Sequence, residues 1–161
     1  MEIKRKFDLG GVFKKNSLKL QDFIDDIKNN PKIRDAGAIF SFTGTVRNSS
    51  FHSEKAVKQM EIEVWGEKAV ESLTEISMRI KEKFNLIDIR IWHTYGILDI
   101  GDDIVYVVVA SGHRESGISA ISASINEYKS LSPIWKKEIY EDGTSKWISG
   151  EQKVKGINKN E

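Results

Sequence analysis

Residues 104–111 read IVYVVVAS, a near-continuous apolar run that is rich in β-branched side chains. Such a run predicts a central strand that is buried on both of its faces. Gly112 interrupts the run, and residues 114–129 then predict a helix that ends before Pro133. The stretch therefore predicts a core strand that leads directly into a helix.

The segments on both sides of this stretch alternate between strand and helix patterns. A period of two predicts strands, and apolar residues at steps of three and four predict helices. The expected strands are residues 3–7, 38–46, 57–65, 86–93, 134–140 and 146–149, and the other expected helices are residues 67–84 and one that Ser17 caps. Strands outnumber the three helices, which predicts an α+β fold.

Composition limits the classes of protein that the chain can represent. It has 161 residues, 25 Lys and Arg, 24 Asp and Glu, and a net charge of +1. We expect one domain over residues 1–149 and a polar tail over residues 150–161. The low net charge argues against a general nucleic-acid binder. Cysteine is absent, which excludes disulfides, thiolate nucleophiles and iron–sulfur clusters in this sequence.

Neither a targeting segment nor a metal motif is evident. No apolar run is long enough for a signal peptide or a membrane span, so we expect a cytoplasmic protein. Three histidines lack ligand spacing; we interpret His93 as structural and His52 as solvated. Asp99, Asp102 and Asp103 suit a tight turn better than a magnesium site. We predict no metal and no cofactor.

Two cationic positions follow strand ends. His113 and Arg114 stand where a helix begins, and free backbone N–H groups make such a terminus an anion site. The alternative is that Arg114 pairs with Glu115 or another surface acid. Arg47 follows the strand of residues 38–46 and is either a second anion ligand or a solvated side chain.

Two lysines stand out by their geometry. Ile118, Ile121, Ile125 and Tyr128 define an apolar stripe on the last helix, and Lys129 falls on its margin. Partial desolvation there would lower its pKa, but position alone favours a lysine that snorkels outward and complements the helix dipole. Lys136 follows seven residues later on the face of Ile134, while Lys137 and Trp135 face the other way. The reversal at Pro133 could bring Lys136 beside Lys129.

Three motifs carry a resemblance to a known family. The segments SFTGTVRN, SGHRESG and EYKSLSPIWKKE occur in this order between about residues 36 and 147. Together they resemble the catalytic (large) subunit of molybdopterin synthase. The resemblance implies an α/β hammerhead fold with an additional antiparallel β-sheet.

The same resemblance implies an activity and partners. Family members transfer sulfur from the C-terminal thiocarboxylate of a small ubiquitin-like carrier subunit to cyclic pyranopterin monophosphate (precursor Z). The product is the molybdopterin dithiolene of the molybdenum cofactor. A homodimer forms the core of a heterotetramer with two carriers. The chain would thus be a sulfurtransferase.

Site residues follow from the matching motifs. The resemblance makes Lys129 and Lys136 catalytic. It places Arg47, His113 and Arg114 around the substrate phosphate, which suits their charge. It adds the substrate-binding positions Thr45, Val46, Lys137 and Glu138.

Two other functions compete with the sulfurtransferase. A non-catalytic module that binds a ubiquitin-like protein would not need Lys129, Lys136 and His113 together. A weak RNA or nucleotide binder would need more aromatic–basic interleaving than this chain has.

Overall fold

Strand β5 (Asp103–Ser111) contains the apolar run and lies between β2 (Ala38–Thr45) and β4 (Asp88–Asp99). The computed structural model describes residues 5–148. Every residue of β5 after Asp103 is buried. Its side chains alternate between two apolar clusters, one on each face of the sheet. The predicted strand buried on both faces is confirmed.

The described residues form one seven-stranded sheet and three α-helices. The sheet order is β2-β5-β4-β3-β6-β7, and β1 pairs in parallel with β4. The remaining elements are β1 (Gly10–Lys14), α1 (Leu20–Lys28), the 3-10 helix η1 (Pro31–Asp35), β3 (Val57–Val64), α2 (Gly66–Lys83), α3 (Arg114–Leu131), β6 (Ile134–Tyr140) and β7 (Ser145–Trp147).

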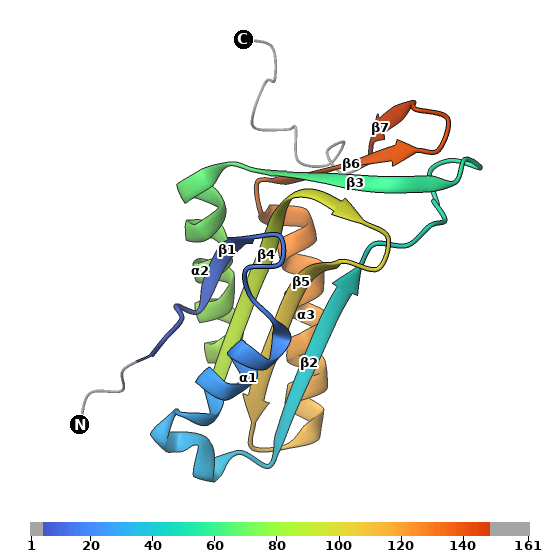
Figure 1. Ribbon diagram of the computed structural model, residues 1–161. Coiled ribbons are helices and arrows are strands. Elements are labelled where there is room, and N and C mark those ends of the chain that lie inside the picture. The colour runs from blue at the N-terminus through green and yellow to red at the C-terminus, as the bar shows by residue number, and fades with distance from the viewer. Residues whose placement is uncertain (1–4, 149–161) are drawn as a thin grey trace.

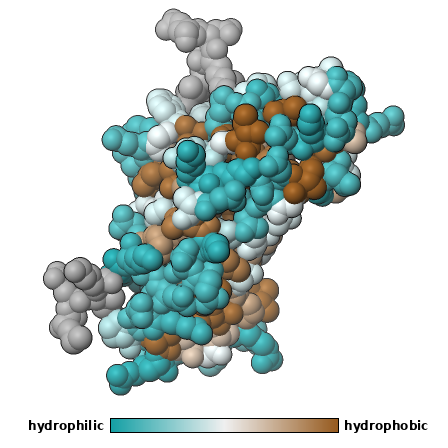
Figure 2. Space-filling view, in the orientation of Figure 1, coloured by the Kyte–Doolittle hydropathy of each residue, from teal (hydrophilic) through white to brown (hydrophobic). Residues whose placement is uncertain are grey.

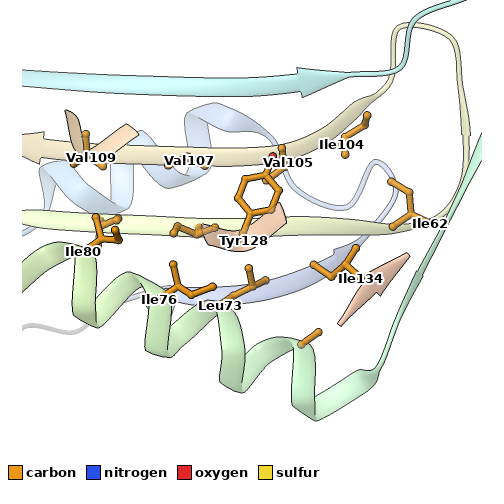
Figure 3. Packing of buried hydrophobic residues seen from close by; sticks show 14 of the residues in the cluster. Ile62, Leu73, Ile76, Ile80, Ile104, Val105, Val107, Val109, Tyr128 and Ile134 are labelled. Atoms are coloured by element: carbon orange, nitrogen blue, oxygen red, sulfur yellow. The ribbon is translucent and has the colours of Figure 1, made fainter. Parts of the chain in front are cut away.

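Helices cover both faces of the sheet. Helices α2 and α3 lie side by side on one face, and α1 covers the other (Figure 1). The larger cluster joins Leu73, Ile76 and Ile80 of α2 to alternate residues of β4 and β5. Figure 3 shows Tyr128 of α3 pointing into this cluster towards Val105. The smaller cluster packs Phe23 and Ile27 of α1 against the opposite face.

The long strand β4 joins two parts of the sheet. Its first half pairs with β5, and residues from Gly96 to Asp99 pair with β3. Strands β3, β6 and β7 form an antiparallel extension that crosses one end of α2 and α3 (Figure 1). This arrangement confirms the α+β fold, a hammerhead with an additional antiparallel sheet.

Two expectations near the N-terminus are wrong. Within the predicted strand of residues 3–7, the described residues 5–7 are not a strand, because the amides of Lys6 and Phe7 donate to Asp26 instead. The first strand is β1, where a Cβ on Gly10 would lie 2.4 Å from the backbone of α2. Ser17 does not cap α1: its hydroxyl donates to Lys14, and Lys19 is the N-cap.

The buried face of α3 also differs from the prediction. Gly117, Ala120, Ser124 and Tyr128 are buried, whereas Ile118 is 56% exposed. Small side chains let α3 approach the sheet closely, since a Cβ on Gly117 would lie 2.5 Å from the ring of Phe40. The predicted stripe is therefore wrong at Ile118 but correct at Tyr128, while Ile121 and Ile125 are partly buried against the larger cluster. Both the predicted tail, residues 150–161, and Ser149 lie outside the described residues.

The surface carries exposed apolar side chains on several elements. In the orientation of Figure 2, they are visible in the upper part of the molecule and also in its lower half. Tyr95 and Ile97 of β4 and Ile100 after it are exposed large hydrophobic residues. None of the helices within residues 5–148 has the length and apolar character needed to cross a membrane.

Candidate active site

A cavity of about 860 Å³ opens where α3, β2 and the antiparallel extension meet. Its lining includes Lys129 from α3, Lys136 and Glu138 from β6, and Thr45 and Arg47 at the end of β2. Five of the residues that the sequence singled out thus share one cavity. Three of them are cations, so the cavity suits an anionic ligand.

The chain reversal at Pro133 brings the two lysines to this cavity, as expected. Lys129 lies in the last turn of α3, and β6 begins at Ile134. Lys129 is exposed, which agrees with the outward-pointing lysine that its position alone favoured. Lys136 is half-buried.

The strand period separates Lys136 from Lys137. Ile134, Lys136 and Glu138 line the cavity, as a period of two requires. Lys137 does not line it; its amine lies 2.5 Å from Glu61 and 5.1 Å from the ring centre of Trp147. The structure places Lys137 on the opposite face of β6.

Two aromatic groups line the cavity together with the lysines. His93 is fully buried and lines the cavity. The centre of its ring lies 5.8 Å from the centre of the Tyr128 ring. Its Nδ1 lies 2.8 Å from the carbonyl oxygen of Thr94, which can only accept, so Nδ1 carries the proton. Burial raises the pKa of Tyr128 and keeps its hydroxyl protonated. A structural role for His93 agrees with this burial, but the sequence did not predict its place in the cavity wall.

The end of β2 contributes two of its three expected residues. Thr45 and Arg47 line the cavity, and the Arg47 guanidinium lies 3.9 Å from the ring centre of Phe51. Val46 does not line it: its side chain is buried, and its N–H and C=O bond to Asp102 and Gly101. His52 lines the cavity as well, which its polar surroundings in the sequence did not indicate.

His113 and Arg114 do not reach this cavity within one chain. They lie where α3 begins, and Lys129 lies in its last turn, 15 residues from Arg114 or roughly 20 Å along the helix. The sheet gives the same result, because Ser111 pairs with Ala38 and Asp103 pairs with Thr45 at the other end of β2. Arg114 is exposed and lies 3.9 Å from Glu115.

The acidic residues near Gly101 form a turn, as predicted. The amine of Lys15 lies 2.9 Å from Asp99 and 2.8 Å from Asp102. Asp102 also accepts from the backbone amide of Asp99. Across residues 5–148, no group of three or more His, Cys, Asp or Glu could hold a metal ion.

Fold and cavity together define an α+β protein with a cationic site for an anionic ligand. The MoaE protein family model matches residues 13–131, so the chain belongs to that family. A Bacillus subtilis relative, a molybdopterin synthase catalytic subunit, is 41% identical over 71% of each chain. A Thermoplasma volcanium relative of the same name is 34% identical over 76% of this chain and 88% of its own. Membership establishes the enzymatic role of a molybdopterin synthase catalytic subunit, in molybdenum cofactor biosynthesis.

Solved structures agree with this assignment. Molybdopterin synthase from Staphylococcus aureus superimposes with a TM-score of 0.74 at 29% identity, covering 86% of this chain and 96% of that one. A chain of a Helicobacter pylori complex of subunits 1 and 2 of molybdopterin-converting factor has a TM-score of 0.67 at 15% identity, over 89% of this chain and 91% of its own. The second likeness concerns the fold alone.

Proposed function

We propose that the cavity is the place where sulfur passes from a carrier's C-terminal thiocarboxylate to cyclic pyranopterin monophosphate. The observation that carries this proposal is the shared position of Arg47, Lys129 and Lys136 in one cavity. Both a thiocarboxylate and a phosphate are anions that such cations bind. Because the sequence has no cysteine, the sulfur has to arrive on another molecule. The Helicobacter pylori complex of two subunits is consistent with a small carrier subunit as that molecule.

Each residue takes a separate part in this proposal. Arg47 binds the substrate phosphate, and Thr45 and Glu138 line the same cavity. Lys129 and Lys136 bind the thiocarboxylate and move protons as sulfur adds and oxygen leaves. The buried His93 and Tyr128 form another part of the cavity wall.

A second copy of the chain supplies His113 and Arg114 in this proposal. Within one copy these residues lie at the far end of α3 from Lys129. A homodimer would bring them to the partner's cavity, and two carriers would complete a heterotetramer. The exposed apolar residues Tyr95 and Ile97 are consistent with a surface that another chain covers.

The direct test is a reaction with a thiocarboxylated carrier and cyclic pyranopterin monophosphate. We expect the dithiolene product well above a control without this protein. No product in the presence of bound carrier would contradict the proposal and favour a non-catalytic binding module.

Subunit mixing tests the shared site. Lys129→Ala and Arg114→Ala should each be inactive or weak as pure proteins. Their mixture should recover up to about a quarter of wild-type activity, since half of the dimers carry one intact site. A mixture no more active than the pure variants would show that the two residues act in the same copy or that Arg114 has no part.

A further inference from the structure

Residues 47–56 form a loop, here called the pocket loop, between β2 and β3 beside the cavity. The amide of Val57 donates to Asn48, which closes the loop on itself. Arg47, Phe51 and His52 of this loop line the cavity. The position of the loop therefore decides the shape of the cavity mouth.

A buried carboxylate on β6 holds this loop. Glu138 is 4% exposed, and its Oε2 accepts hydrogen bonds from the Ser50 hydroxyl at 2.5 Å and the Tyr140 hydroxyl at 2.9 Å. A carboxylate buried at this depth requires such donors. The pKa of Tyr140 is raised by burial and by its bond to Glu138, so the phenol remains a donor.

Ser50 connects Glu138 to the rest of the pocket loop. Its Oγ also accepts from the backbone amide of His52 at 2.9 Å, which fixes the turn around Phe51. The ring of Phe51 in turn lies under the Arg47 guanidinium, 3.9 Å from its centre. A continuous set of contacts thus connects Glu138 to the cation that faces the cavity.

The far end of the pocket loop is fixed by the turn between β6 and β7. The amine of Lys55 lies 2.8 Å from Asp142 and donates to Thr144 at 2.8 Å. The amide of Glu141 donates to Ala56. These contacts are exposed, and exposed pairs contribute little. The bonds to the buried carboxylate of Glu138 are accordingly the stronger anchor.

We propose that Ser50 and Tyr140 are positioning residues that, through Glu138, hold the pocket loop so that Arg47 faces the substrate phosphate. This inference rests on the proposed function of the cavity. Glu138 acts in it as the acceptor for the loop. The chemistry at Lys129 and Lys136 lies on α3 and β6, so it does not depend on the loop.

Loss of the anchor should therefore weaken substrate binding more than turnover. An interaction that contributes equally to the ground state and the transition state changes KM and leaves kcat unchanged. A hydrogen bond to a charged acceptor corresponds to about tenfold in an equilibrium constant.

The experiment measures kcat and KM for cyclic pyranopterin monophosphate at saturating thiocarboxylated carrier. Ser50→Ala should raise KM about tenfold with kcat within about twofold. Tyr140→Phe should raise KM by less, because Ser50 still donates to Glu138. Ser50→Thr keeps the hydroxyl and should restore most of the affinity. Ser49→Ala is the matched control, since Ser49 is the exposed neighbour, and it should behave as the wild type.

Hydrogen exchange gives a reading that does not depend on catalysis. The amides of residues 48–56 should exchange faster in Ser50→Ala than in Ser49→Ala. Equal exchange and equal KM in these two variants would overturn the positioning role. If the wild type makes no product, the proposed function fails, and the exchange comparison alone then decides whether Ser50 holds the loop.

Discussion

Two charged clusters lie on opposite faces of β4 and differ in how their cations are paired. On the α1 face, Arg90 is fully buried between Asp26 and Asp88, at 2.9 Å and 2.5 Å. On the other face lies the cavity that contains Arg47 and Lys129. Within residues 5–148, neither of these two cations makes an ion pair with an acidic side chain.

This difference in pairing indicates that the Arg90 cluster serves stability and the cavity serves activity. The Arg90 cluster is closed: its guanidinium bonds to both carboxylates, and Asn30 donates to Asp88. Removing one member of a buried pair leaves an uncompensated charge. The cavity is open, and an anion that enters it would pair with Arg47 and Lys129. We therefore expect changes in the first cluster to lower stability and changes in the second to lower activity.

Arg90→Met should give the largest loss of stability. It leaves Asp26 and Asp88 buried without their cation, which should lower the free energy of unfolding by about 3–5 kcal/mol. Urea unfolding measures this loss. Arg79→Met is the control: Arg79 makes an exposed ion pair with Glu127, and its loss should cost less than about 1 kcal/mol. Equal losses in both variants would contradict the special role of the buried cluster.

Lys136→Ala and Lys137→Ala should separate the two faces of β6. Lys136 lines the cavity, so its loss should lower turnover about 100-fold, which corresponds to about 2.7 kcal/mol. Lys137 is half-buried against Glu61 and does not line the cavity, so its loss should change turnover less than about twofold. A strong loss of turnover in Lys137→Ala would show that both faces of the strand meet the substrate.

Low pH should also lower the free energy of unfolding through the Arg90 cluster, by less than Arg90→Met does. Burial raises the pKa of Asp88, but the hydrogen bond and charge of Arg90, with Asn30, outweigh burial and hold that pKa below its usual value. This contribution to stability is complete above the unfolded-state pKa of about 3.9 and is lost as pH falls through the folded-state pKa. Urea unfolding from pH 6 to pH 3 should show a steeper loss in wild type than in Arg90→Met. Parallel curves would refute the contribution of Asp88.

Strong periodic patterns predicted most of the fold. The apolar run of β5, the helix α2 and the alternation of β6 follow directly from local sequence. In two places, tertiary packing gives a structure that the local sequence pattern did not predict. Strand β1 begins with two glycines that strands usually disfavour, because it lies against the backbone of α2. The buried face of α3 consists of small residues apart from Tyr128, and a hydrophobicity pattern does not detect the small ones.

The candidate site was predictable only where residues are close in sequence. The reversal at Pro133 placed Lys129 and Lys136 together, and the strand period separated Lys136 from Lys137. The bond between Ser50 and Glu138 joins residues 88 positions apart, so no local pattern could indicate it. His113 lies far from the cavity, as the length of α3 and the strand register both show.

Lys129 tests the central claim most directly, because its position also suits a lysine that merely complements a helix dipole. Lys28 is its matched control, since it is an exposed lysine in the last turn of α1. Dithiolene formation would be measured for both alanine variants with thiocarboxylated carrier, beside urea unfolding and carrier binding. We predict that Lys129→Ala forms no product while it folds and binds the carrier, and that Lys28→Ala matches wild type. Equal product formation by the two variants would contradict the account.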